Sequence, residues 1–266
     1  MKKNYLTKKQ IDNYKRDGAI VVQGVFKPWI NLLRLGFNKV LKKPGIHSRE
    51  NINLSGEGRF FEDYCNWQRI LEFKNCIEKS PAAQIVAEAT RSKSIRIFHE
   101  HIFLKESGTI KPTPWHQDMP YYCVDGNDTG SFWIPLDPVN KKNTLQLILG
   151  SHKWPKLVKP TKWLDNKSWY NNNSEFTSMP PIENIKKKKM IFELKIGDAI
   201  LFNFKTLHSS PGNITKNSRR AFSMRFMGDD VRYLKRDGKT SPPFDGINLK
   251  TGENMRNDWF PVVWNR

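Results

Sequence analysis

The sequence lacks the features that mark several large classes of protein. It has only 3 cysteines in 266 residues and no CxxC pair, so neither a disulfide framework nor a thiolate zinc site is indicated. No run of about 18 uncharged apolar residues occurs, so we expect no membrane-spanning helix. The basic start "MKKNYLTKKQ" is not followed by the apolar core and cleavage site of a secretory signal. We therefore expect a reduced, cytoplasmic protein.

Motifs of several common enzyme classes are also missing. The chain has no GxSxG nucleophile elbow, no GxxxxGK[ST] phosphate loop and no GxGxxG segment after a strand. Hydrolase, NTPase and dinucleotide-binding interpretations therefore lack the residues on which their chemistry depends.

Acidic residues are few relative to basic ones, with 26 Asp and Glu against 45 Lys and Arg and a net charge of +19. Clustered lysines and arginines would favour nucleic acid by releasing counterions from phosphates. Here the lysines are scattered and the only long run is Lys186–Lys189, so we expect no specific nucleic-acid partner. Arg96, Arg225 and Arg232, on or near predicted strands, favour an anionic small-molecule substrate. The alternative is a basic nucleic-acid-binding protein with a structural or vestigial metal site.

The N-terminal part of the sequence has helical patterns. Thr7 and Gln10 form the pattern of a capping box, and Ile30, Leu33 and Phe37 recur at helical spacing. We predict a helix over 7–18, a strand over 19–26, a helix over 27–45 and a helix over 81–91.

From residue 94 the pattern changes to short apolar or alternating runs between turns. The predicted strands lie in the segments 94–104, 130–137, 143–152, 190–210 and 219–228. Helices first and strands later, without βαβ alternation, indicate an α+β fold. We expect a mainly antiparallel sandwich or barrel with helices packed on one side.

One long polar segment interrupts the strands, at about 153–189. It is broken by prolines, yet it contains aromatic residues that include Trp163 and Trp169. A loop of this length in a compact domain is usually functional, so we predict a lid over a pocket. The predicted single domain, 1–266, otherwise comprises a helical part at about 1–93, a strand-rich core at about 94–230 and a C-terminal extension at about 231–266.

The stretch "TPWHQDMPYY" places His116 two positions before Asp118. Residues two apart in an extended chain point to the same face, so both side chains can converge on one metal ion. His208 is the strongest candidate for a third ligand, because it follows a predicted strand and precedes the turn "SSPGN". Two histidines and a carboxylate form the facial triad of non-haem Fe(II) enzymes, although zinc also accepts this set. Arg219, eleven residues after His208, can clamp the far end of a dicarboxylate cosubstrate.

The chain resembles the phytanoyl-CoA dioxygenase family of Fe(II)- and 2-oxoglutarate-dependent oxygenases in five ordered segments: "WHQDMPYY", "SFWIPLDPV", "NTLQLILGSHKW", "GDAILFNFKTLHSSPGN" and "SRRAFSMRF". The resemblance covers roughly 95–230 and extends more loosely from residue 10. It implies a double-stranded β-helix (jelly-roll) core with iron held by His116, Asp118 and His208.

The same resemblance implies cosubstrate contacts. Arg219 would bind the far carboxylate of 2-oxoglutarate, and Trp133 and Ser210 occupy positions that contact this molecule in the family. Lys105 begins "KESG", where the family often has a lysine-proline run. Core packing by Trp133 and turn capping by Ser210 remain alternatives.

The resemblance further implies the reaction. The enzyme would use O2 to hydroxylate a small molecule, releasing succinate and CO2 from 2-oxoglutarate. Related halogenating enzymes lack the metal-binding carboxylate, so the presence of Asp118 favours hydroxylation.

His99 and His101 form a second histidine pair, on a predicted strand that would place Ile95, Ile97 and Phe103 on the same side. Cupins begin a metal site with such a pair. The glycine expected six residues earlier is Lys93, however, and no glutamate stands in the third-ligand position. We therefore expect both histidines to line the pocket, with His101 near the cosubstrate.

Overall fold

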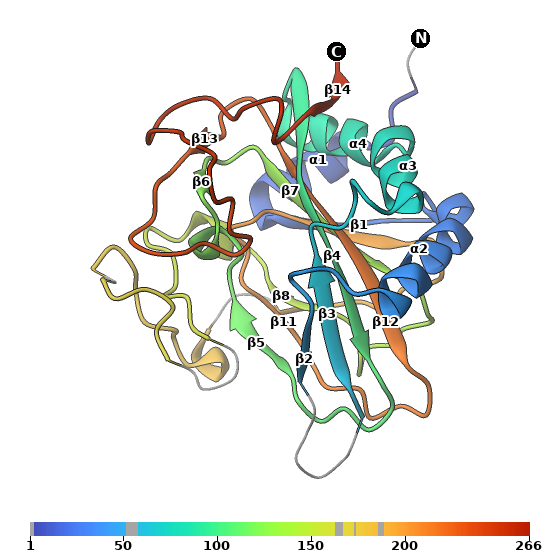
Figure 1. The fold of residues 1–266 in the computed structure, drawn as a ribbon. Helices are drawn as coiled ribbons and strands as arrows, with labels where there is room; N and C mark the ends of the chain where they lie inside the picture. Colours follow the sequence, from blue (N-terminus) through green and yellow to red (C-terminus); the bar gives the residue numbers. More distant parts are fainter. Residues whose placement is uncertain (1–2, 52–57, 163–166, 173, 186–188) are drawn as a thin grey trace.

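The protein is described here by a computed structural model that covers residues 3–51, 58–162, 167–172, 174–185 and 189–266. Its helices gather against one face of a large antiparallel sheet (Figure 1). They are α1 (Lys8–Asp17), α2 (Ile30–Lys42), α3 (Leu71–Lys79) and α4 (Ala82–Thr90), with 3-10 turns at Lys27–Trp29, Met119–Tyr121, Ser151–Lys153 and Ile182–Asn184. None of the described helices is long and apolar enough to span a bilayer.

Helix α1 confirms the predicted capping signals. The Thr7 side chain accepts from the Gln10 backbone, and the Gln10 side chain accepts from the Thr7 backbone. The helix ends at Gly18, whose φ of 75° is left-handed, and an added Cβ would lie 2.3 Å from the His152 ring. Gly18 is therefore required both by the backbone and by the close packing beneath the helix.

Helix α3 was not predicted. It buries Phe73, Cys76 and Ile77 at helical spacing against the same core as α2 and α4. Helix α2 is shorter than the predicted 27–45, because Pro28 lies in the preceding 3-10 turn and the chain leaves the helix before Pro44. The apolar stripe of each helix packs on the outer face of the large sheet.

The strands form two main sheets, which confirms the predicted jelly-roll class. The large sheet has the order β1 (Ala19–Val22), β10 (Ala199–Phe202), β7 (Thr129–Pro135), β12 (Arg219–Met227), β4 (Ser94–Lys105), β3 (Phe60–Tyr64) and β2 (Arg49–Asn51), with β14 (Val262–Asn265) paired to β4. The smaller sheet has the order β5 (Thr113–His116), β11 (His208–Ser210), β8 (Gln146–Ile148) and β9 (Lys189–Ile191), and β6 (Val124–Asp125) pairs with β13 (Arg232–Tyr233). The predicted helical part thus also contributes β1, β2 and β3.

A bulge in β4 decides which of its side chains face the pocket. His99 is opposite Arg225 on β12, but the next pair is Ile97 with Phe226, so Phe98 is an extra residue. Such a bulge reverses the alternation of side chains along a strand. Ile97 consequently packs in the helix-side core, whereas His99 and His101 line the cavity between the sheets. The expectation that Ile95 and Ile97 share a face with these histidines was therefore wrong.

Candidate metal centre

The smaller sheet brings the two predicted metal-binding histidines together. His116 ends β5 and His208 begins β11, and they are direct partners in the antiparallel register. Asp118 is not extended, as the sequence argument assumed, but stands at the start of a 3-10 turn with φ −71° and ψ −43°. The turn, rather than strand alternation, directs this carboxylate toward the histidines.

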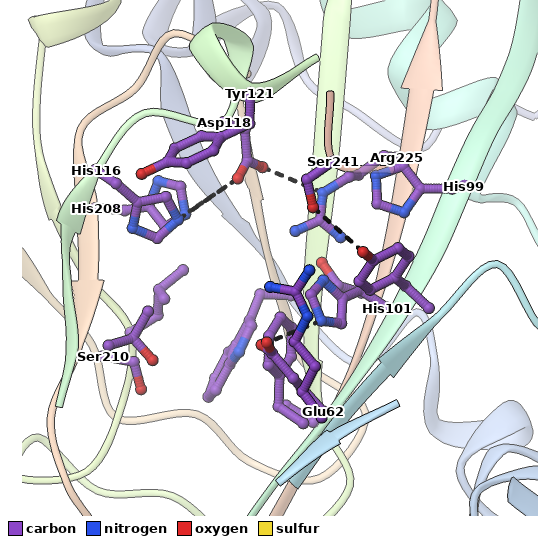
Figure 2. A pocket seen from close by; sticks show the side chains of 18 of the residues that line it. Glu62, His99, His101, His116, Asp118, Tyr121, His208, Ser210, Arg225 and Ser241 are labelled. Carbon is purple, nitrogen blue, oxygen red and sulfur yellow. Dashed lines mark hydrogen bonds and ion pairs between the residues drawn. The ribbon is translucent and has the colours of Figure 1, made fainter. Parts of the chain in front are cut away.

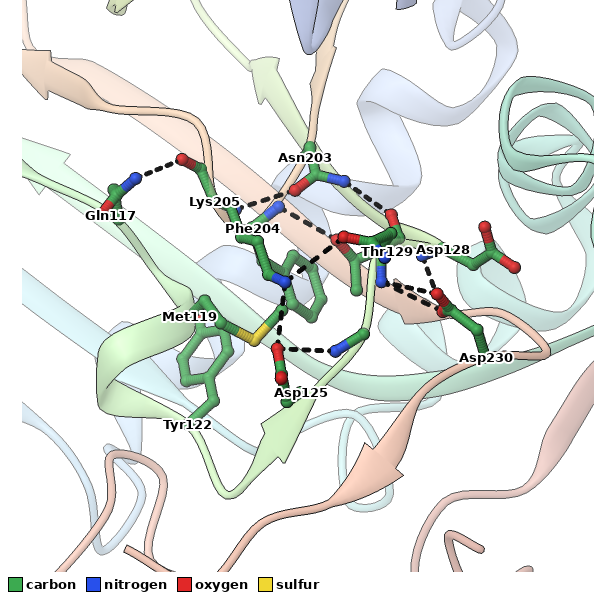
Figure 3. A network of polar contacts seen from close by, with 12 residues as sticks. Gln117, Met119, Tyr122, Asp125, Asp128, Thr129, Asn203, Phe204, Lys205 and Asp230 are labelled. Carbon is green, nitrogen blue, oxygen red and sulfur yellow. Dashed lines mark hydrogen bonds and ion pairs between the residues drawn. The ribbon is translucent and has the colours of Figure 1, made fainter. Parts of the chain in front are cut away.

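One loop holds both parts of the centre in place. The backbone N–H groups of Asp118 and Met119 donate to the Phe204 carbonyl at 2.9 and 3.0 Å, and the Phe204 N–H donates to Thr129 Oγ1 at 3.1 Å (Figure 3). Gln117, between the two ligands, donates to the Lys205 carbonyl at 2.5 Å. The loop that leads into β11 and His208 is therefore fastened directly to the turn that carries Asp118.

The three side chains have the geometry of a metal site. Asp118 Oδ1 lies 3.6 Å from His116 Nε2 and 3.7 Å from His208 Nε2, and the candidate ligand atoms all lie within 4.8 Å of one another (Figure 2). His116 Nδ1 donates to the Pro114 carbonyl at 2.8 Å, and His208 Nδ1 donates to the Thr206 carbonyl at 2.9 Å. Since a carbonyl only accepts, each bond fixes the hydrogen on Nδ1 and directs the Nε2 lone pair to the centre.

The protonation states of Asp118 and His208 also suit a metal. Burial would raise the pKa of Asp118, but Arg225 and the two histidines outweigh it and hold this pKa well below the usual value. Burial, with His116 nearby, lowers the pKa of His208 to about 3. An ionised carboxylate and a neutral imidazole at neutral pH are the states in which these groups bind metals.

Arg225 contacts the candidate metal centre, a contact that the sequence argument missed. Its Nε donates to Asp118 Oδ2 at 3.2 Å, and Ser131 Oγ donates to the same oxygen at 3.2 Å. These bonds occupy Oδ2 and leave Oδ1 directed at the histidines. The available signal was the alternation along β12, where Arg225 shares a face with Arg219.

Two buried basic side chains, Arg219 and Lys105, lie at another end of the cavity. Arg219 donates from Nη2 to Ser210 Oγ at 2.8 Å and from Nη1 to the Asn143 carbonyl. Lys105, its partner in the β4–β12 register, donates to the carbonyls of Ser210 and Pro211 at 3.1 and 3.0 Å. Burial lowers the pKa of Arg219 to about 10, and burial together with Arg219 lowers that of Lys105 well below its usual value.

Neither basic side chain is paired with a carboxylate in the described part of the chain. Among the residues that the structure describes, no carboxylate forms an ion pair with Arg219 or Lys105 within 4.0 Å. Buried charges without a partner are costly, so this end of the cavity favours an anion. A ligand carboxylate beside the Arg219 guanidinium would remove the cost.

All eight predicted site residues line one cavity of about 510 Å³ between the sheets. They are His101, Lys105, His116, Asp118, Trp133, His208, Ser210 and Arg219. Arg96 and Arg232 do not reach it, because they donate to Phe260 and to Asp229 and Val231 carbonyls. Since Arg225 is paired with Asp118, these three arginines give little support to the predicted anionic substrate, which stays a prediction.

The predicted lid contributes to the cavity in part. Lys162 and Trp169 line it, and the Trp169 ring packs edge-on against Tyr121 at 5.2 Å between centroids. Ser241 and Pro242 from the C-terminal extension line it as well. Trp163 and the lysines at 186–188 lie outside the described residues.

Comparisons with known proteins point in the same direction. A family model for phytanoyl-CoA dioxygenase matches residues 14–221. The peroxisomal phytanoyl-CoA dioxygenase of the rat, Rattus norvegicus, is 23% identical over 256 residues, which are 88% of this chain and 72% of the rat protein.

Solved structures share the fold. The epimerase SnoN, in complex with Fe3+, α-ketoglutarate and nogalamycin RO, aligns with a TM-score of 0.76 and 18% identity over 96% of this chain and 98% of SnoN. EctD from S. alaskensis, with 2-oxoglutarate and 5-hydroxyectoine, aligns with a TM-score of 0.67 and 16% identity over 96% of this chain and 87% of EctD.

Proposed function

The chain belongs to the phytanoyl-CoA dioxygenase family, and from this premise we propose that it is an Fe(II)- and 2-oxoglutarate-dependent oxygenase that hydroxylates a small molecule. The observation that carries the proposal is the pairing, in one cavity, of a two-histidine, one-carboxylate centre with a buried and unneutralised arginine. The three side chains of the centre can bind iron on one side of the ion, and the arginine can bind the far carboxylate of a dicarboxylate.

The proposed metal ligands are His116 Nε2, Asp118 Oδ1 and His208 Nε2. When bound there, iron would supply the activation of O2 that is coupled to decarboxylation of 2-oxoglutarate. Asp118 supplies the negative charge of the set, and Arg225 keeps its second oxygen away from the metal. The backbone carbonyls of Pro114 and Thr206 keep the two imidazoles in the required tautomer.

The proposed cosubstrate anchor is Arg219, whose guanidinium would pair with the far carboxylate of 2-oxoglutarate. Ser210 orients this guanidinium through its hydroxyl, and the Lys105 amine donates to the carbonyls of Ser210 and Pro211 beside it. Trp133 and His101 line the same cavity and would form walls around the bound molecule. Burial strengthens the pairing because little water competes for the carboxylate.

Hydroxylation is the finer part of the proposal. It is supported by Asp118, which occupies the metal position that an enzyme transferring a halide would have to leave open. The fold alone does not select the outcome, since SnoN, which shares it, is named an epimerase. The cavity volume of about 510 Å³ suits a small molecule alongside the cosubstrate.

The test is turnover by purified protein under O2 with Fe(II) and 2-oxoglutarate. We expect 2-oxoglutarate-dependent oxygen uptake with release of succinate, and a substrate screen by mass spectrometry should find a product heavier by one oxygen atom. Omission of Fe(II) or of 2-oxoglutarate is the control and should stop succinate release. Failure of the protein to bind both would contradict the proposed function.

The nucleic-acid alternative makes a different prediction. A basic binding protein would shift a DNA or RNA probe in a salt-dependent way, and His116→Ala would leave that shift unchanged. Tight, salt-dependent probe binding without any 2-oxoglutarate turnover would favour this alternative.

A further inference from the structure

Four buried polar atoms face the cavity without a hydrogen-bond partner in the described part of the chain. They are Glu62 Oε2, His99 Nε2, His101 Nε2 and Arg225 Nη1, and we call their side chains the polar wall. The four residues are only 2% to 8% exposed. Buried polar groups are nearly always hydrogen-bonded, so these atoms give this side of the cavity the chemistry to bind a polar group of a ligand.

The polar wall extends along the large sheet from Arg225, which contacts Asp118 of the metal centre, to Glu62. Glu62, His99, His101 and Arg225 come from the neighbouring strands β3, β4 and β12 of the large sheet, whereas His116 and His208 come from the smaller sheet (Figure 2). His99 and Arg225 are register partners, so their side chains are adjacent on the same face. His99 and Arg225 are paired six positions along β12 from Arg219, the proposed anchor of 2-oxoglutarate, so this part of the wall is separate from the anchor. It is therefore placed to contact the primary substrate.

The tautomer of His99 defines what it can bind. Its Nδ1 donates to the Glu100 carbonyl at 3.1 Å, so the hydrogen is on Nδ1. Burial, with Arg225 nearby, lowers the pKa of His99 well below the usual value, so the ring is neutral. Its Nε2 is then a bare acceptor that requires a donor from the ligand.

Glu62 adds a second acceptor. Burial would raise its pKa, but His101 outweighs burial and the pKa is lowered, so Glu62 carries a carboxylate. Its Oε2 lies 3.4 Å from His101 Nε2 without the geometry of a hydrogen bond. Glu62 thus faces His101, and His99 Nε2 is the acceptor that needs a hydrogen from the ligand.

Arg225 supplies a donor but little free charge. Its Nε is bound to Asp118 Oδ2 at 3.2 Å, which pairs the guanidinium with a carboxylate, and Nη1 still offers a hydrogen to the cavity. A ligand carboxylate would accept from Nη1 but has no hydrogen for His99. A ligand ammonium would donate to His99 but has nothing to accept from Arg225. A hydroxyl group does both, because it is donor and acceptor at once.

We propose that the polar wall binds a hydroxyl group of the primary substrate, which donates to His99 Nε2 and accepts from Arg225 Nη1. The substrate class is thus a compound that already carries an alcohol, which would be bound beside the large sheet. The inference rests on the proposed function, since it takes the cavity to hold the primary substrate beside 2-oxoglutarate.

Three ring compounds of similar size test whether the ligand must donate a hydrogen bond: cyclohexanol, which has a donor, and cyclohexanone and cyclohexanecarboxylate, which have only acceptors. Their binding is measured by NMR titration of protein loaded with Zn(II), which is diamagnetic, and 2-oxoglutarate. We expect the alcohol to bind about tenfold more tightly than the ketone, since the ketone leaves His99 unpaired. Equal binding of alcohol and ketone, or tightest binding of the carboxylate, would overturn the proposal.

Variants at one position test the role of His99. His99→Phe should reduce the preference for alcohol over ketone to about one, and His99→Gln, whose amide oxygen accepts, should restore part of it. The control His152→Gln, outside this cavity, should keep the full preference. A preference that persists in His99→Phe would count against the proposal.

A measurement on the unaltered protein covers the case in which His99→Phe does not fold. With 15N-labelled histidine, the His99 Nε2 resonance should be that of an unprotonated nitrogen and should move when cyclohexanol is added. A protonated Nε2 would refute the tautomer on which the inference depends. Binding of 2-oxoglutarate is checked first: its absence would count against the proposed function, whereas its presence without alcohol selectivity would count against the polar wall alone.

Discussion

Asp118→Ala is expected to abolish 2-oxoglutarate turnover, lowering kcat/KM by about a thousandfold or more, because metal catalysis supplies several kcal/mol. The change removes the carboxylate that lies 3.6 and 3.7 Å from the two imidazole nitrogens. It also leaves the buried Arg225 without its partner, which opposes binding of a second cation nearby. Succinate release and Fe(II) binding, measured on the same preparation, check the prediction.

A milder variant and a distant control separate loss of the metal from loss of the fold. Asp118→Asn keeps the size of the side chain and an acceptor for Ser131, so it should fold and still lose activity. Asp125→Ala removes an exposed carboxylate paired with Lys205 at 3.0 Å and should keep activity within about twofold. Full activity in a folded Asp118→Ala protein would exclude this residue as a ligand.

Arg219→Ala is expected to raise the KM for 2-oxoglutarate roughly ten- to a hundredfold, the effect of losing a charge-assisted pair of about 1.5 to 3 kcal/mol. The guanidinium is buried and has no protein carboxylate among the described residues. Removal also frees Ser210, which holds it in place. Initial rates of succinate release at varied 2-oxoglutarate check the prediction.

The neighbouring arginine is a matched control. Arg220 points to the other face of β12 and is bound by Asp137 at 2.7 and 3.0 Å, so Arg220→Ala should leave the KM for 2-oxoglutarate nearly unchanged. Arg219→Lys keeps the charge but loses the paired donors, and it should fall between the wild type and Arg219→Ala. Equal effects of Arg219→Ala and Arg220→Ala would indicate general loss of stability rather than loss of an anchor.

Local signals in the sequence were sufficient for part of the fold. The capping box at Thr7 and the glycine that ends the first helix are short-range patterns, and the structure has both. The ordered apolar runs between turns were sufficient for an antiparallel sandwich or barrel with helices on one side, and the family resemblance implied the jelly-roll. Helix α3 was not predicted because it is short and begins without a side-chain cap, so its apolar positions, which include Phe73 and Ile77, gave only a weak helical pattern.

The parts of the site that could not be predicted depend on tertiary structure. The bulge at Phe98 is fixed by pairing between β4 and β12, and no pattern within 94–104 marks it. Likewise, the contact of Arg225 with Asp118 joins residues 107 positions apart. Residue type and spacing indicated the three metal ligands, Arg219 and His101, whereas the family resemblance indicated Trp133, Ser210 and Lys105. The pairing of strands within the two sheets brings all eight residues to one cavity.

Anomalous diffraction at the iron edge, on crystals grown anaerobically with Fe(II) and 2-oxoglutarate, tests the central claim most directly. The account predicts one strong peak bounded by His116 Nε2, Asp118 Oδ1 and His208 Nε2, with 2-oxoglutarate extending from it to the Arg219 guanidinium. Iron bound elsewhere, or no iron between these three atoms at saturating Fe(II), would contradict it.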